Sequence, residues 1–398
     1  MKSLLQLLVL GAGLLLCFPP ATSAEEILFE ETAEPVPMPL TVTAHLPSSS
    51  ARFVLDTGAG PVLLDLSLRP AEVTGEHTIR AHGFGSVLDL TAFDSPQISL
   101  GKWHLPSGDA VVLDCGPFRK VSGVDLRGII GIAPLQGVAI DVDFDRHRLR
   151  LIRDFIPPAN AQPYSPTAPP EGIAYLPLTF LREDSDPSID LKLEGIPLHL
   201  IIDTGSNDSI GLRHEAFEQL QAAGVIAPFQ KVPSATISGS TLARLGVFTR
   251  GQLLGINLKG ILVSDGADID NLGMQFLDRF HFIVDLPQRR FYFGRNHVES
   301  VSIGDSLGMQ FIYGSGRPQV AYVKKGGRAE KNGIRIDDQI LQCGPLSEKE
   351  MNIPSVYALC ASHAGQTIEV TFDRPGFPKP HKVRLLVLDE EKPKVKKP

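Results

Sequence analysis

The sequence predicts an all-β protein of two similar lobes, followed by a smaller α+β domain. Three observations predict it: an internal repeat of strands and turns, a proline-rich segment between the two copies, and a change of pattern after about residue 302. The predicted boundaries are 25–156 for the first lobe, 157–172 for the linker, 173–300 for the second lobe and 301–390 for the last domain.

The repeat is the strongest organising signal. In each copy an alternating strand and a turn precede an apolar strand that ends in Asp-Thr-Gly. An apolar strand ending in glycine follows each of these turns at a similar distance, at Gly131 and Gly273. A β-hairpin pattern closes both copies. The two turns read Asp56-Thr57-Gly58-Ala59 and Asp203-Thr204-Gly205-Ser206.

The segment between the copies is predicted to be a linker, because proline disfavours the interior of a strand or helix. Helical patterns are few in the two lobes. The clearest covers residues 214–223 and is stopped by Gly224. The prolines of the linker are Pro157, Pro158, Pro163, Pro166, Pro169 and Pro170.

The first residues predict a secretory signal peptide over residues 1–24. Lys2 supplies a positive start, an apolar run covers 4–18, and small residues precede a cleavage position after Ala24. That run is short for a membrane-spanning helix and no later stretch is longer, so we expect no transmembrane segment in the mature chain. The mature chain is therefore expected in the periplasm or secreted.

The net charge bears on the partners of the chain, and the cysteine content bears on its disulfides. A net charge of −7 disfavours a nucleic-acid partner, and the basic residues at 391–398 are expected to form a disordered tail. Cys115, Cys343 and Cys360 remain after cleavage, which is too few for a disulfide scaffold. Cys343 and Cys360 either pair with each other or act as buried apolar residues, and we favour the second interpretation.

Asp56 and Asp203 are the candidate catalytic residues. Two carboxyl groups that face one water can hydrolyse a peptide bond: the ionised one takes a proton from the water, and the protonated one polarises the carbonyl. Like charges a few ångströms apart do not both ionise, so the pair shares a proton. No metal or organic cofactor is implied by the motifs of the chain.

The residues that follow each aspartate suit this chemistry. Gly58 and Gly205 allow a tight turn and let backbone N–H groups approach the carboxylates. Thr57 and Thr204 carry short hydroxyls that can bond across the interface between lobes. Ser206 can donate a hydrogen bond to Asp203, whereas Ala59 has nothing to donate to Asp56. We therefore expect Asp203 to be the more acidic carboxyl group.

Residues 30–297 resemble the retropepsin-like and pepsin-like aspartic proteases, on the strength of both Asp-Thr-Gly turns with Ile129-Ile130-Gly131 and Leu272-Gly273. The resemblance implies a two-lobed pair of acid-protease-like β-barrels with the two aspartates on a pseudo-twofold axis. It also implies a cleft for polypeptide substrates. Asn271 departs from the family, which usually has an aliphatic residue there. The candidate flap tips are Gly83-Phe84-Gly85 and Ser238-Gly239-Ser240.

Residues 303–388 resemble a PDZ domain, which implies binding of peptide C-termini. Leu307, Gly308 and Met309 fit the loop that receives the terminal carboxylate through backbone N–H groups. A strand over 309–313 would pair with the peptide, and a helix over 355–362 would form the other side of the groove.

The function expected from the sequence is that of a secreted or periplasmic aspartic endopeptidase. Its PDZ domain would bind substrates or peptide termini. The alternative is a catalytically weak or inactive extracytoplasmic scaffold with the same shape. The chain holds both Asp-Thr-Gly turns, so we expect a monomer. Pairing of lobes between two chains is a lesser alternative.

Overall fold

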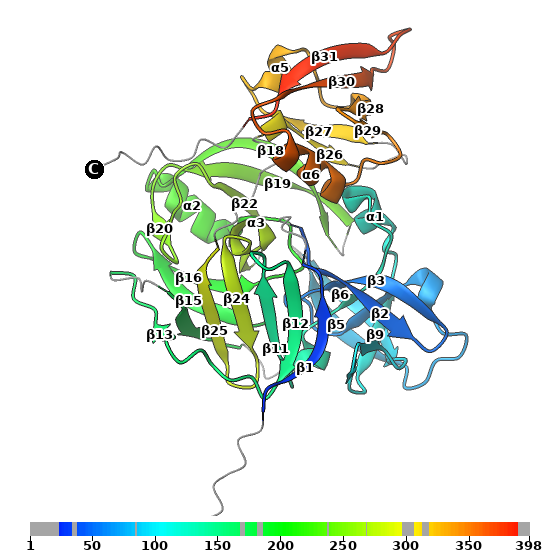
Figure 1. Ribbon diagram of the computed structural model, residues 1–398, viewed down its shortest axis with the longest axis vertical. Helices are drawn as coiled ribbons and strands as arrows, with labels where there is room; N and C mark the ends of the chain where they lie inside the picture. Colours follow the sequence, from blue (N-terminus) through cyan, green and yellow to red (C-terminus); the bar gives the residue numbers. More distant parts are fainter. Residues whose placement is uncertain are drawn as a thin grey trace, which may run out of the picture.

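A computed structural model describes residues 24–33, 38–83, 86–167, 172–180, 186–236, 239–267, 269–296, 306–312 and 318–388. The predicted signal peptide, apart from Ala24, lies outside these ranges, as do the basic tail and the flap residues Phe84, Gly85 and Ser238. The described chain is mostly β, with several sheets and few helices. Two β lobes form the body, and a smaller C-terminal unit lies at one end (Figure 1).

The first lobe is built on a nine-stranded sheet in the order β5-β6-β9-β4-β10-β3-β2-β7-β8. Its central strands β3 and β10 run parallel, which sets Ile130 beside Leu55. Both side chains are fully buried, so the end of β3 is held rigidly. The strands are β2 (Thr41–Leu46), β3 (Ser49–Leu55), β4 (Val62–Asp65), β5 (His77–Gly83), β6 (Ser86–Asp94), β7 (Ser99–Leu100), β8 (Trp103–His104), β9 (Asp109–Leu113) and β10 (Leu126–Ile130).

The second lobe repeats this arrangement in a seven-stranded sheet, β15-β16-β23-β17-β22-β19-β18. Here β16 and β23 run parallel and set Leu272 beside Ile202. The predicted helix is confirmed as α2 (His214–Ala222), and Gly224 follows it with a φ of +68°. The strands are β15 (Ser188–Leu193), β16 (Ile196–Ile202), β17 (Ile210–Arg213), β18 (Ile226–Thr236), β19 (Gly239–Phe248), β22 (Leu262–Ala267) and β23 (Asp270–Leu272), with β20 (Gln252–Leu253) and β21 (Ile256–Asn257) forming a separate pair.

A third sheet joins the two lobes, because β11 of the first pairs antiparallel with β24 of the second. The imidazole Nε2 of His281 lies 2.7 Å from the Asp141 carboxylate across this pair, so His281 has a structural partner. The sheet order is β1 (Glu26–Glu31), β12 (Arg148–Arg153), β11 (Ala139–Asp143), β24 (Phe280–Asp285), β25 (Arg290–Arg295), β14 (Ala174–Pro177) and β13 (Gln162–Pro163).

The predicted linker is more ordered than its prolines suggested. It contributes strand β13, which pairs in parallel with β14 at the edge of the third sheet. An edge strand tolerates Pro163 because one side of the strand has no ladder partner that needs its N–H. Tyr164 continues this contact, since its ring lies 5.5 Å from that of Phe293.

The C-terminal unit has its own sheet, in the order β26-β27-β28-β30-β31 with β29 on β28. Its core contains Cys343 and Cys360 as free thiols, and burial raises the pKa of each to about 12. The interpretation of these cysteines as buried apolar residues is confirmed. The elements are β26 (Met309–Ile312), β27 (Gln319–Val323), α5 (Arg328–Lys331), β28 (Gln339–Cys343), β29 (Leu346–Ser347), α6 (Ile353–Ser362), β30 (Thr367–Asp373) and β31 (His381–Leu386).

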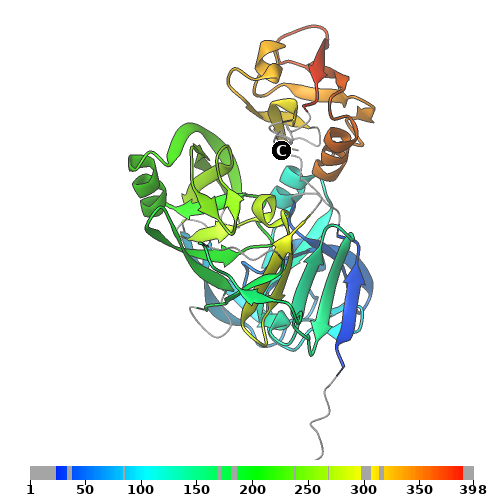
Figure 2. The ribbon, with the colours of Figure 1, turned by 60° about the vertical axis from the view of Figure 1, so that its left-hand side comes forward.

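The C-terminal unit contacts both lobes. Helix α1 (Gly116–Ser122) packs against edge strand β26, and β18 packs against β27. Met38 and Val124 of the first lobe join the apolar core of the unit. In both views α1 lies between the first lobe and the C-terminal unit (Figures 1 and 2).

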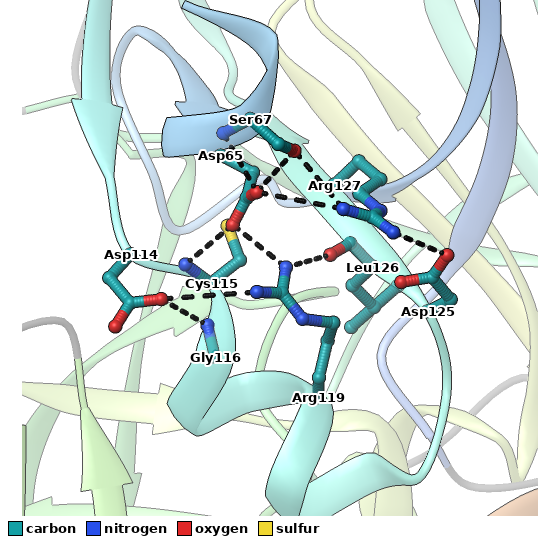
Figure 3. Close-up of polar contacts among 9 residues, drawn as sticks. All are labelled: Asp65, Ser67, Asp114, Cys115, Gly116, Arg119, Asp125, Leu126 and Arg127. Carbon is teal, nitrogen blue, oxygen red and sulfur yellow. Dashed lines mark hydrogen bonds and ion pairs between the residues drawn. The ribbon is translucent and has the colours of Figure 1, made fainter.

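Helix α1 is anchored by an ionic network (Figure 3). The buried carboxylate of Asp65 accepts hydrogen bonds from Arg119 at 2.7 Å and from the backbone N–H of Cys115 at 3.0 Å. Burial alone would raise the pKa of Asp65, but the hydrogen bonds from Ser67, Arg119 and Cys115 outweigh it and lower that pKa. The network therefore fixes the helix that contacts β26.

Candidate active site

The two Asp-Thr-Gly turns meet at the centre of the body, each at the end of a central strand. The N–H of Asp56 donates to the carbonyl of Ile130 at 2.9 Å, and the N–H of Asp203 donates to that of Leu272 at 3.0 Å. The parallel strand beside each turn thus holds its aspartate in the same way. The structure brings together both predicted aspartates and the residues that follow them.

The two threonines interlock the turns. The N–H of Thr57 donates to Oγ1 of Thr204 at 3.0 Å, and the N–H of Thr204 donates to Oγ1 of Thr57 at 3.1 Å. Each hydroxyl then donates to a carbonyl of the opposite lobe: Thr204 to Leu55 at 2.6 Å, and Thr57 to Ile202. Both threonines are fully buried, so these bonds form without competition from water.

Each catalytic carboxyl group lies against the glycines of both turns. Each accepts a bond from its own glycine: Gly58 N–H to Asp56 at 2.8 Å, and Gly205 N–H to Asp203 at 3.1 Å. Each also lies against the other glycine. A Cβ on Gly58 would stand 2.7 Å from Cγ of Asp203, and one on Gly205 would stand 2.1 Å from Cγ of Asp56. Only glycine leaves room for the two carboxyls to face each other.

The two carboxyls are hydrogen-bonded to each other and titrate as a pair. Burial, followed by the negative charge of Asp203, raises the pKa of Asp56 well above 3.8. Burial also raises the pKa of Asp203, but hydrogen bonds oppose the rise, the largest from the side chain of Asn271. The hydrogen bond from Asn271 therefore favours the charge on Asp203 and the proton on Asp56.

The sequence predicted this asymmetry for a different reason, and that reason is wrong. The Ser206 hydroxyl does not donate to Asp203; its Oγ accepts the N–H of Asp208 at 3.1 Å. The side-chain donor to Asp203 is Asn271, whose Nδ2 lies 2.9 Å from Oδ2 of Asp203. The sequence had marked Asn271 only as a departure from a family. Its polar side chain in a buried strand was the signal of its role.

A third carboxyl, that of Asp186, was also missed by the sequence analysis. It is partly buried; its charge raises the pKa of Asp56, and the charge of Asp203 raises the pKa of Asp186 itself. The signal lay in the repeat: Asp186 lies two residues before β15, the strand that pairs with the strand leading to Asp203. The equivalent residue of the first lobe, Pro39, has no charge.

The predicted peptide-binding loop is remote from this pair, because Leu307, Gly308 and Met309 belong to the C-terminal unit. The side chains of Leu307 and Met309 are fully buried in its core. Gly308 has a φ of +73°, which favours glycine, and its carbonyl accepts the N–H of Lys324 at 2.9 Å. Only the backbone of this loop is therefore left to contact a ligand.

Within the described ranges, no group of three or more His, Cys, Asp or Glu side chains could hold a metal ion. Among the helices of the same ranges, none combines the length and the hydropathy needed to cross a membrane.

Comparison with solved structures gives a weak structural match to this chain. The crystal structure of an aspartic proteinase from Irpex lacteus matches with a TM-score of 0.42 and 15% sequence identity, over 69% of this chain and 98% of that chain. Likeness at this level assigns no function to the chain. No protein-family model matches the chain, and no curated protein matches it.

Proposed function

We propose that the two lobes form an aspartic endopeptidase that hydrolyses peptide bonds with the Asp56–Asp203 pair. One observation carries the proposal: two hydrogen-bonded carboxyl groups, that of Asp203 buried and that of Asp56 partly buried, face each other from turns that are interlocked by Thr57 and Thr204. An unpaired buried carboxylate is costly, so a pair held face to face and stabilised only in a singly protonated form suits acid–base chemistry.

The mechanism follows from where the proton resides. Ionised Asp203 takes a proton from a water between the carboxyls, while Asp56 donates its proton to the carbonyl oxygen of the scissile bond. The resulting oxygen nucleophile adds to the carbonyl carbon. Asp203, now protonated, then gives its proton to the amide nitrogen, the C–N bond breaks, and Asp56 regains a proton from the tetrahedral intermediate. The pair returns to its starting state.

The substrates are proposed to be extended polypeptides that enter between the two lobes, and the site of action is proposed to be outside the cytoplasm. The second point rests on the predicted signal peptide at residues 1–24. N-terminal sequencing of the exported protein tests it: the mature chain is expected to begin after Ala24, and retention of Met1 would contradict export by this route.

Digestion of a denatured protein across acid and neutral pH tests the catalytic proposal. Asp56→Asn and Asp203→Asn are each expected to reduce cleavage by at least about a thousandfold. Asp190→Asn is the matched control, since Asp190 is exposed on β15 and pairs with His199. Full activity in both Asn variants would exclude the pair as catalyst. A wild-type protein that binds polypeptide but cuts nothing would support the scaffold alternative.

For the C-terminal unit we propose PDZ-like binding of peptide C-termini. Strand β26 is the edge of its sheet, and an edge strand offers backbone groups for an added strand. Peptides with a free terminal carboxylate are expected to bind more tightly than the same peptides with an amidated end. Equal binding of the two forms would exclude recognition of the carboxylate.

A further inference from the structure

The register of two strand pairs places a third carboxyl opposite the catalytic Asp203. In the antiparallel β15–β16 pair, Ser188 stands opposite Ile201. One step nearer the turn, the N–H of Ile202 donates to the carbonyl of Pro187 at 2.8 Å. Both strands end here, and extending the register by one residue places Asp186 beside Asp203, whose negative charge acts on the Asp186 carboxyl.

The position of the first lobe that is equivalent to Asp186 carries an uncharged residue. In the β2–β3 pair, Thr41 stands opposite Val54, and the N–H of Leu55 donates to the carbonyl of Leu40 at 2.8 Å. The next step brings Pro39 opposite Asp56. The two halves of the site therefore match in backbone but differ in charge, since one carries a proline and the other a carboxyl group.

Where the chain is described, the charge that acts on Asp186 is negative. Among the residues that the structure describes, no lysine, arginine or histidine forms an ion pair with Asp186. Burial, followed by the negative charge of Asp203, raises the pKa of Asp186 to about 7. The side chain is only partly buried, so part of it remains open to an incoming group.

We propose that Asp186 is a specificity-determining residue that binds a cationic side chain, lysine or arginine, of the polypeptide substrate close to the scissile bond. The inference rests on the proposed function of the Asp56–Asp203 pair. A bound cation stabilises a partly desolvated carboxylate that lies beside a second negative charge more than it stabilises an exposed carboxylate. A neutral or acidic substrate side chain offers no such gain.

The position of Asp186 separates this role from catalysis. Asp56 and Asp203 each end a buried strand and accept a bond from the glycine two residues on. Asp186 instead lies two residues before β15 and is followed by Pro187, which has no N–H to offer a carboxylate. Asp186 is thus placed to contact a substrate side chain beside the reacting bond.

A set of matched peptides tests the proposal in the full chain. Starting from a peptide that the protein cuts at one bond, each of the two residues on either side of that bond is replaced in turn by lysine, norleucine or glutamate. At one position, kcat/KM is expected to be about tenfold higher for lysine than for norleucine. Asp186→Asn is expected to abolish this ratio, and Asp186→Lys to favour glutamate instead.

The matched control is Asp190→Asn, the same change four residues further along the chain, on β15 and about 13 Å away in an extended segment; it is expected to keep the lysine preference. A wild-type protein without any lysine preference would overturn the proposal, and so would an Asp186→Asn variant that retains it. Reversal in Asp186→Lys is a result that a purely structural role of Asp186 would not produce.

A binding measurement separates this inference from the catalytic one. Peptides in which a hydroxyethylene group replaces the scissile bond cannot be cut, yet they carry the same side chains. At about pH 8, where Asp186 is ionised, the lysine form is expected to bind about tenfold more tightly than the norleucine form, and Asp186→Asn to bind both alike. Absence of cleavage overturns the catalytic proposal, whereas equal binding of both forms to wild type overturns this one.

Discussion

Nδ2 of Asn271 donates a hydrogen bond of 2.9 Å to Oδ2 of Asp203, and among the described residues of the first lobe no side chain donates in the same way to Asp56. The strand registers show why. Asn271 pairs with Ile201, one residue before the strand end, and Ile129 pairs with Val54 at the same step of the first lobe. An amide in one lobe and an aliphatic side chain in the other make the two catalytic carboxyls unequal.

The first prediction concerns Asn271→Leu. Loss of the amide donor removes the largest effect that opposes the rise in the pKa of Asp203, so that pKa rises further. Cleavage needs one ionised carboxyl. The acid limb of the pH profile of kcat/KM is therefore expected to move up by about one pH unit, with a loss of about tenfold at acid pH. Ile129→Leu, at the equivalent position, is expected to leave the profile unchanged.

The stability of the same variant provides a second readout. Oδ1 of Asn271 is buried and has no hydrogen-bond partner among the described residues. Leucine removes that unpaired atom but also the donor to Asp203, so the two effects oppose each other and Asn271→Leu is expected to change the free energy of unfolding by no more than about 1 kcal/mol. A variant that is less stable and has an unchanged pH profile would show that Asn271 serves folding rather than the catalytic pair.

The second prediction concerns Gly205→Ala. The new Cβ would stand 2.1 Å from Cγ of Asp56, closer than real atoms approach, so the carboxyl of Asp56 must move away from that of Asp203. Activity is expected to fall by at least about a hundredfold, since the pair depends on its mutual geometry. Gly60→Ala is the control within a catalytic turn, because nothing lies within 4 Å of its added Cβ, and it is expected to remain active.

The third prediction concerns the pH dependence of stability from Asp65. Its pKa in the folded chain lies below its ordinary value of 3.8, so its contribution to stability is complete above that value and is lost as the pH falls below it. Asp65→Asn is expected to lower the free energy of unfolding by about 2–3 kcal/mol at neutral pH. The difference from wild type is expected to shrink below about pH 4.

Urea denaturation followed by tryptophan fluorescence measures this effect, because the single tryptophan, Trp103, lies in the first lobe. Asp125→Asn is the control, since the side chain of Asp125 is 68% exposed and its pairing with Arg127 contributes little. A constant difference between Asp65→Asn and wild type from neutral to acid pH would contradict the assignment.

The sequence predicted the elements that repeat and missed the contacts that depend on register. The two Asp-Thr-Gly turns and α2 follow from local patterns of apolar, polar and glycine residues, and the structure has them. Asp186 lies near Asp203 only because β15 pairs with β16. Asn271 contacts Asp203 only because β23 runs parallel beside β16. Such pairings join residues far apart in the chain, so no local pattern contains them.

The last prediction concerns the contact between the first lobe and the C-terminal unit. Val124 packs into the apolar core of that unit, and α1 packs against β26, the strand proposed to bind peptides. A docked α1 therefore competes with an added peptide strand.

Val124→Glu places a charge in this apolar contact and weakens it by about 1–2 kcal/mol, so a peptide with a free C-terminus is expected to bind to the variant about tenfold more tightly than to wild type. Fluorescence anisotropy of a labelled peptide measures this, and Ile156→Glu, at a side chain that is 58% exposed, is expected to bind as wild type does. Equal binding by Val124→Glu and wild type would show that α1 leaves the edge of β26 accessible.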